Sequence, residues 1–354
     1  MSTQPGPPGR PRRAPKPYRR PQPDAARRAA FDVLRAVAER DAYANLVLPE
    51  LLTGRGIEGR DAAFATELTY GTLRGQGSYD VVLAACVDRP LDQVDAPVRD
   101  VLRLGAHQLL AMRVPSHAAV SATVELARAV LGDGRAKFVN AVLRRVGARD
   151  LASWVGELAP AYDVDPVGHL AVAHSHPRWV VSAVRDALGG SLEETAALLA
   201  ADNVAPAVSL VARPGRAEVA ELLAAGALPG RWSPYAATLP GGDPGALAAV
   251  REGRAGVQDE GSQLVALALA AAPLEGPDRR WLDLCAGPGG KAALLGALAR
   301  ERGGRLVAAE LRPHRARLSR RAVAGDADVV VADGRVPAWQ AGHSYLEAGR
   351  LGRR

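Results

Sequence analysis

Between residues 24 and 150, apolar side chains recur along the chain with the period of an α-helix. One stripe has the spacing i, i+3, i+4, i+7, i+11 and i+14, and it consists of Val98, Val101, Leu102, Gly105, Leu109 and Met112. After Pro115, two further stripes follow, made of Val120, Val124, Ala127 and Leu131 and then of Val139, Val142, Leu143 and Val146. Such stripes bury one side of each helix in a shared core. The pattern predicts a bundle of five or more helices.

The period changes towards the end of the chain. Three short apolar runs have the character of buried parallel strands, and two helix-like stretches separate them. The runs are residues 281–285, 306–310 and 329–333, and the helix-like stretches are residues 291–302 and 312–323. The order strand, helix, strand, helix, strand predicts the first half of a doubly wound α/β domain, which we place in residues 246–354.

Residues 151–245 show a mixed pattern between these two regions. Residues 208–212 form a short β-like run, residues 216–227 are helix-like, and residues 229–244 form a connection rich in glycine and proline. We therefore expect a small α+β linker domain here.

The net charge of the chain lies at its start and changes the predicted domain organisation little. The formal net charge is +7, and residues 1–30 alone account for it. Residues 1–23 carry eight prolines and six basic side chains with no acidic one, a composition that cannot bury enough apolar surface to offset the entropy of ordering. We expect a disordered basic arm. It is either a source of salt-dependent attraction to phosphates or a solvated extension.

Other features of the sequence limit the class of protein. The longest apolar run, residues 264–272, is too short to span a bilayer, and no signal-peptide pattern opens the chain, so we expect a monomeric cytoplasmic protein that contacts no membrane. The chain has two cysteines, Cys86 and Cys285, which excludes a disulfide framework and a cysteine-built zinc site. Because His174 and His176 lack a third ligand, we expect no metal.

A glycine-rich segment follows the first predicted strand, with the sequence Asp-Leu-Cys-Ala-Gly-Pro-Gly-Gly-Lys at residues 283–291. Glycines let a ligand approach the backbone, and the next helix offers unpaired N–H groups, so we expect a nucleotide-like ligand. A Walker A phosphate loop is excluded, because it requires glycine where Cys285 stands and Ser or Thr where Ala292 stands. The spacing allows NAD or an adenosyl cofactor.

Two acidic residues end the second and third predicted strands. Glu310 is placed to accept hydrogen bonds from ribose hydroxyls, and Asp333 is placed to receive an adenine amino group. Each residue alone fits a solvated strand terminus equally well. Because the carboxyl ends of parallel strands meet at one crevice, their convergence on the glycine turn favours a binding site.

The glycine turn resembles the first motif of the RNA cytosine-C5 methyltransferases, and residues 257–263 resemble the segment that precedes it. Residues 27–30, 64–71 and 137–144 are similar to the NusB-like RNA-binding domain. This fusion is typical of the bacterial methyltransferases of small-subunit ribosomal RNA. The resemblance implies a multidomain protein with an all-α NusB-like bundle, the small α+β linker domain and an α/β Rossmann-like methyltransferase domain.

The resemblance also implies a cofactor and roles for individual residues. The cofactor is S-adenosylmethionine and the partner is small-subunit ribosomal RNA. Glu310 would hold the ribose, and Asp333 would lie beside the adenine. The methionine moiety would be wrapped by Cys285, Ala286, Gly287, Pro288, Gly289, Gly290 and Lys291.

The chemistry of this family needs a cysteine that the sequence does not supply. A thiolate adds to C6 of the cytosine, so that C5 can take the methyl group. The nucleophile lies in a Thr-Cys motif, a second cysteine lies in an Asp-Ala-Pro-Cys-like motif, and neither motif occurs here. Similarity ends near Trp339. We therefore expect a truncated, incomplete methyltransferase domain whose first strand has an exposed apolar edge, and a chain without catalytic activity.

Two other functions remain open at this point. A non-catalytic RNA-binding protein would act through the helical bundle alone. An NAD-linked oxidoreductase would use the same glycine turn for a nicotinamide cofactor.

Overall fold

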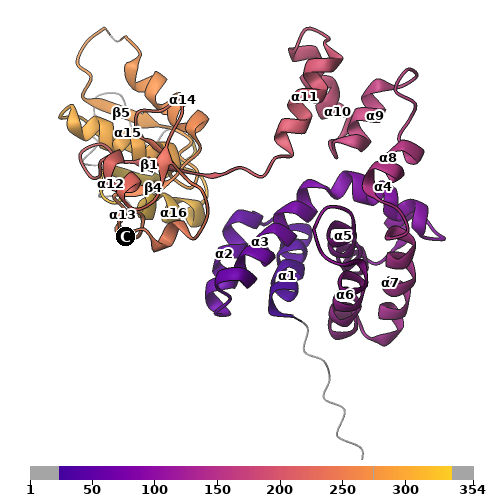
Figure 1. Ribbon diagram of the computed structural model, residues 1–354. Helices are drawn as coiled ribbons and strands as arrows, with labels where there is room; N and C mark the ends of the chain where they lie inside the picture. Colours follow the sequence, from indigo (N-terminus) through magenta and orange to yellow (C-terminus); the bar gives the residue numbers. More distant parts are fainter. Residues whose placement is uncertain (1–23, 274, 337–354) are drawn as a thin grey trace, which may run out of the picture. The chain divides into compact units, whose positions relative to one another are not determined.

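The computed structural model describes residues 24–273 and 275–336, and the chain divides into two compact units between Ala205 and Pro206 (Figure 1). The first unit is helical. Its helices are α1 (Ala25–Arg40), α2 (Ala44–Gly54), α3 (Gly59–Arg74), α4 (Gln76–Cys86), α5 (Ala96–Leu110), α6 (Ser116–Leu131), α7 (Asp133–Val146), α8 (Leu151–Leu158), α9 (Pro166–Ala173), α10 (Arg178–Ala187) and α11 (Leu192–Asp202), with a short 3₁₀ helix at Leu91–Gln93.

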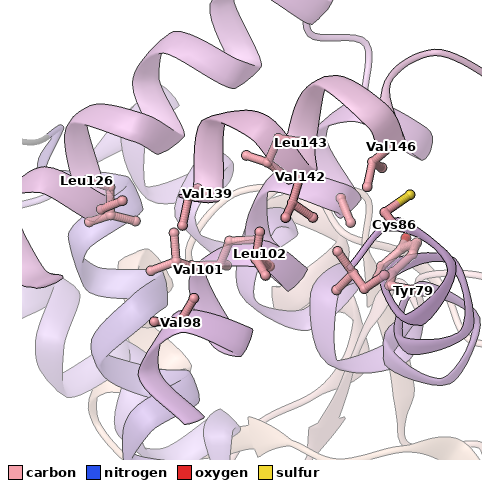
Figure 2. Packing of buried hydrophobic residues seen from close by; sticks show 14 of the residues in the cluster. Tyr79, Cys86, Val98, Val101, Leu102, Leu126, Val139, Val142, Leu143 and Val146 are labelled. Atoms are coloured by element: carbon pink, nitrogen blue, oxygen red, sulfur yellow. The ribbon is translucent and has the colours of Figure 1, made fainter. Parts of the chain in front are cut away.

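The core of the first unit is the one that the periodicity predicts. Figure 2 shows Val98, Val101 and Leu102 of α5 beside Val139 and Val142 of α7, and all five side chains are buried. Fully buried apolar side chains such as these remove apolar surface from water, which stabilises the fold by about 2 kcal/mol for each side chain. The sequence prediction of a helical bundle in residues 24–150 is therefore confirmed.

A histidine, His107, is buried in this bundle. The Nδ1 atom of His107 and the hydroxyl of Tyr79 are hydrogen-bonded at 2.8 Å. The Nε2 atom of His107 lies 3.5 Å from a carboxylate oxygen of Glu67. The pKa of His107 is lowered to about 4: burial is the main cause, the nearby Arg74 contributes in the same direction, and a hydrogen bond with the backbone of Glu67 opposes both effects. The neutral imidazole is therefore the form that the folded bundle accommodates.

We expect the first unit to lose stability as the pH falls from 6.5 to 4. The pKa of His107 is lower in the folded chain than its ordinary value of 6.5, so the unfolded chain binds the proton first and the contribution is fully present only above pH 6.5. The loss should approach about 3 kcal/mol. Urea unfolding of the whole chain at several pH values measures it. His107→Gln should flatten this dependence, His117→Gln should not, and equal profiles for the two variants would contradict the prediction.

The helices that follow residue 150 belong to the first unit. The indole Nε1 of Trp154 donates to the carbonyl of Val146 at 3.0 Å, and the hydroxyl of Ser78 donates to the carbonyl of Val172 at 2.6 Å. Residues 151–245, expected to be one small α+β domain, are therefore divided in the structure. Their helical part packs on α4 and α7, and only the part after Ala205 is α+β.

The second unit begins with a four-stranded antiparallel sheet. Its elements are β1 (Val208–Ala212), α12 (Val219–Ala224), β2 (Leu228–Pro229), β3 (Ala236–Leu239), a 3₁₀ turn at Pro244–Ala246, α13 (Ala248–Arg251) and β4 (Ala255–Val257). The spatial order β2-β3-β1-β4 with this β-α-β-β-α-β sequence is the ferredoxin-like arrangement. One face of the sheet is covered by α12 and α13, through residues such as Leu210, Leu222 and Ala249.

A parallel sheet follows in the same unit. Its elements are α14 (Glu260–Ala271), β5 (Arg280–Asp283), α15 (Gly290–Glu301), β6 (Arg305–Glu310), α16 (Pro313–Val323) and β7 (Ala327–Val331). The strands lie in the order β5-β6-β7, with Asp283 opposite Ala308 and Glu310 opposite Val331. The predicted alternation of strands and helices is confirmed. The third strand ends two residues earlier than expected, so Asp333 lies beyond it.

Helix α14 joins the two sheets into one unit. Val211 of β1 is buried in the same apolar cluster as Ala266 of α14 and Leu295 of α15. The side-chain amide of Gln263 donates to the carbonyl of Leu210 at 3.2 Å. The second face of the ferredoxin-like sheet is therefore covered by α14 and by α15, which packs on the parallel sheet.

Strand β5 is an edge of the parallel sheet in the part of the chain that the structure describes, because it pairs with β6 alone. Leu282 and Leu284 are 37% and 41% exposed at this edge. Unpaired N–H and C=O groups beside apolar side chains make such an edge prone to pairing with other chains.

Among the helices that the structure describes, none has the length and apolar character needed to span a bilayer.

Candidate cofactor site

The glycine turn connects β5 to α15 in a backbone conformation that glycine favours. Gly287 has φ 58° and Gly289 has φ 99°. A Cβ on Gly289 would lie 2.7 Å from the Cα of Ser319 and 2.9 Å from the Cβ of Ala322, both in α16. Glycine is therefore required at position 289 for two reasons, the positive φ and the contact with α16.

The turn is held against β6, and it leaves the start of α15 uncapped. The backbone N–H of Ala286 donates to the carbonyl of Ala309 at 2.9 Å. Among the residues that the structure describes, no side chain caps the N-terminus of α15, and both Gly290 and Lys291 are exposed at its first turn. The unpaired N–H groups and the helix dipole make this end of α15 favourable for an anionic group such as a carboxylate.

Asp283, the last residue of β5, and Lys291, at the start of α15, border the turn. Burial raises the pKa of the Asp283 carboxyl, although the backbone N–H of Cys285, which donates to it at 3.2 Å, and the nearby Lys291 both favour its charged form. The thiol of Cys285 is exposed. The predicted residues Cys285, Gly287, Gly289 and Lys291 thus lie in one turn at the carboxyl edge of the sheet.

Glu310 lies at the same edge, at the end of the neighbouring strand. It is 6% exposed, and its Oε1 accepts a hydrogen bond from the backbone N–H of Arg312 at 2.9 Å. The residue before it, Ala309, is the one that binds the glycine turn. A buried carboxylate beside the turn retains acceptor capacity for ligand hydroxyl groups.

Asp333 reaches this edge from the loop after β7. A Cβ on Gly334 would lie 2.9 Å from the Cγ of Leu284, so this loop packs on the glycine turn. The carboxylate of Asp333 accepts from the guanidinium of Arg335 at 2.7 Å and from its backbone N–H at 3.0 Å, and these bonds hold its pKa below the ordinary value. The three predicted strand ends are therefore brought together, with Asp333 already engaged by a neighbour.

Sequence reasoning missed Arg315, which lies between the two main parts of the site. Its Nε is 3.9 Å from Oε2 of Glu310, and a Cβ on Gly287 would lie 2.9 Å from its guanidinium. One feature of the sequence could have found it: Arg315 lies one turn before Ser319 on α16, the helix that follows Glu310. Because Ser319 contacts Gly289, that face of α16 must point at the glycine turn.

The two cysteines occupy different units. Cys86 is 1% exposed in the bundle core, close to Tyr79 and Val146 (Figure 2), and burial raises the pKa of its thiol. The interpretation of Cys86 as a core residue is confirmed. In residues 24–273 and 275–336, no group of three or more His, Cys, Asp or Glu side chains is placed to hold a metal ion.

Known proteins resemble this chain over most of its length. Residues 24–148 match the NusB family. A candidate methyltransferase of Mycobacterium tuberculosis is 58% identical over 303 residues, which are 85% of this chain and 66% of that protein. The ribosomal RNA small subunit methyltransferase B of Pseudomonas syringae is 32% identical over 330 residues, which are 90% of this chain and 69% of that protein. The same enzyme of Xanthomonas campestris is 34% identical over 277 residues, 77% of this chain and 58% of that protein.

A solved structure supports the fold. The crystal structure of PH0851 matches with a TM-score of 0.69 at 19% identity, covering 89% of this chain and 70% of that one. The predicted order of a NusB-like helical region followed by a region of sheets and helices, consistent with a Rossmann-like methyltransferase domain, is therefore confirmed. The chain spans about two thirds of the length of the curated relatives it matches.

Proposed function

Because this chain belongs to the ribosomal RNA small subunit methyltransferase B family, we propose that it derives from an enzyme that methylates C5 of a cytosine in small-subunit ribosomal RNA with S-adenosylmethionine. In this proposal the first unit binds RNA and the carboxyl edge of the parallel sheet binds the cofactor. The observation that carries it is the convergence of the glycine turn, Glu310 and Asp333 at one edge.

The residues at this edge fit S-adenosylmethionine. Gly287, Gly289 and Gly290 leave three positions of the turn without side chains, and a Cβ on Gly289 would meet α16, so packing on that helix fixes the backbone there. The buried Glu310 suits ribose hydroxyls, and the uncapped start of α15 with Lys291 suits the methionine carboxylate. When bound, the cofactor supplies an activated methyl group. Asp333 would exchange its hydrogen bonds with Arg335 to accept from the adenine amino group.

The same residues explain why we propose that residues 1–354 bind but do not methylate. A thiolate must add to C6 of the cytosine before C5 can attack the methyl group. Cys285 lies in the cofactor turn itself, and Cys86 is buried in the bundle core. Neither thiol is placed to face a base beyond the methyl group. The second candidate, a non-catalytic RNA-binding protein acting through the NusB-like bundle, is favoured by this same shortage of thiols.

RNA binding by the whole chain should weaken steeply with salt. Lysine and arginine side chains that contact phosphates release counterions, and residues 1–23 bring six basic side chains. Deleting residues 1–23 should reduce the slope of log affinity against log salt concentration by up to about 4, because each contact to a phosphate of a single strand contributes roughly 0.7 to the slope. Fluorescence anisotropy with small-subunit RNA measures both slopes. Base stacking should contribute less, because aromatic residues make up 4% of the chain.

Shortened chains serve as controls for the bundle. If the first unit alone, residues 24–205, retains RNA affinity at low salt, the helical unit contributes contacts of its own, as its match to the NusB family suggests. Loss of all RNA affinity on deletion of residues 1–23 would contradict a role for the bundle. Binding of S-adenosylmethionine should be equal in the full chain and in residues 24–354.

A further inference from the structure

Helix α16 concentrates positive charge to an unusual degree. Five arginines and one histidine lie between residues 312 and 321, and no acidic residue lies among them. The buried side of the helix consists of Ala316, Ser319 and Val323. Exposed basic residues lie at its start and along its remaining surface, and we call them the basic face of α16: Arg312, His314, Arg317, Arg320 and Arg321.

This arrangement is unfavourable for the helix by itself. The N-terminus of a helix is the positive end of its dipole, where acidic side chains are favourable, yet the first turn of α16 has none and carries His314 and Arg315 instead. Arg317 and Arg321 are four residues apart, and like charges at this spacing repel. Arg320 and Arg321 lie in the last turn, where the helix dipole favours cations, so the cost falls on the first turn and on the repulsion between Arg317 and Arg321. An anionic partner would offset that repulsion.

Several arginines elsewhere in the second unit are paired with acids. Arg216 binds Asp326 through two hydrogen bonds of 2.5 and 2.7 Å, and Arg254 contacts Glu221 at 2.6 Å. On the basic face, by contrast, no carboxylate of the described residues lies within 4.0 Å of an arginine nitrogen. Arg320 donates only to the carbonyl of Val329, at 3.3 Å. Single arginines such as Arg251 also lack an acid in the described part of the chain, but the basic face gathers four such arginines within residues 312–321.

We infer that the basic face of α16 binds the phosphate backbone of RNA. This inference rests on the proposed function, in which an RNA base must come beside the methyl group of the cofactor at the carboxyl edge of the second unit. Arginine is suited to the role because its guanidinium binds phosphate oxygens through paired hydrogen bonds. The face begins beside Arg315, which contacts the cofactor turn, so an RNA strand along α16 leads to the edge where the methyl group is held.

The test compares two triple variants of the full chain in RNA-binding titrations. The first is Arg317→Gln, Arg320→Gln and Arg321→Gln. The matched control removes three exposed arginines elsewhere in the second unit, Arg251→Gln, Arg279→Gln and Arg305→Gln. With a labelled single-stranded fragment of small-subunit ribosomal RNA, the first variant should lose about tenfold in affinity and reduce the salt slope by about 2. The control should change both by much less.

Further measurements keep the outcome interpretable. Calorimetric binding of S-adenosylmethionine should be unchanged in the first variant, which shows that α16 still supports the glycine turn. The charge-conserving triple variant with lysine at positions 317, 320 and 321 should retain the salt slope. Equal losses in the two glutamine variants, or no loss in either, would overturn the inference alone. Failure of the unaltered chain to bind RNA at low salt would overturn the proposed function with it.

Discussion

Replacing Gly289 by valine should abolish binding of S-adenosylmethionine. The new Cβ would lie 2.7 Å from the Cα of Ser319, and valine would have to adopt a φ of 99°, which a β-branched side chain rarely tolerates. The turn must therefore move, and the ligand loses its cradle. We expect the Kd measured by calorimetry to rise about a hundredfold or more, which corresponds to roughly 3 kcal/mol.

Gly303→Val is the matched control for this substitution. Gly303 also has a positive φ, 68°, and it lies in the same unit, but a Cβ there would meet nothing within 4 Å. It should lower stability through backbone strain and leave cofactor affinity close to that of the unaltered chain. Titration with NAD should give no comparable binding. Unchanged affinity for S-adenosylmethionine in Gly289→Val would refute the site, and tight NAD binding would favour an oxidoreductase.

Incubating the purified 354-residue chain with S-adenosylmethionine and protein-free small-subunit RNA should give methyl incorporation no higher than background. Positioning alone does not activate C5, because the step that makes it nucleophilic is the covalent addition of a thiolate. The exposed apolar edge of β5 should also make the second unit prone to aggregate, so cofactor binding should be weak. Transfer of a labelled methyl group into the RNA measures the first effect.

Two cysteine variants show whether this explanation of inactivity is right. Cys285→Ala and Cys86→Ala should both behave like the unaltered chain in the methylation assay. Incorporation that is lost in Cys285→Ala and retained in Cys86→Ala would mean that the exposed thiol of Cys285 is the nucleophile. That result would overturn both the expected inactivity and the role of Cys285 in the cofactor turn.

The parts of the fold that periodicity could predict are those where one element buries one face. The stripe from Val98 to Met112 lies on α5 and the residues just after it, and the apolar run at residues 306–310 is the central strand β6. Both are dictated by burial along a single element. The convergence of the glycine turn and Glu310 could also be predicted, because the connection rules of parallel sheets fix which strand ends meet.

Other features depend on contacts between distant segments. Strand β3 lies inside a stretch expected to be a connection, because Ala236–Leu239 has little intrinsic strand preference and becomes a strand by pairing with β1. The division at Ala205 was missed because the packing of Trp154 on α7 leaves no mark on local periodicity. Arg315 and the bonds between Arg335 and Asp333 depend on side-chain directions that spacing alone does not give.

The way α14 covers the ferredoxin-like sheet has a consequence for synthesis of the protein on the ribosome. Residues 206–257 contain all four antiparallel strands, but Val211 is covered by Ala266 and Leu295, which are translated later. A nascent chain that has emerged only as far as β4 therefore presents an apolar surface to water and to chaperones. The sheet can finish folding only after α15, the helix that follows the glycine turn, has left the exit tunnel. The second unit therefore folds late and in one step.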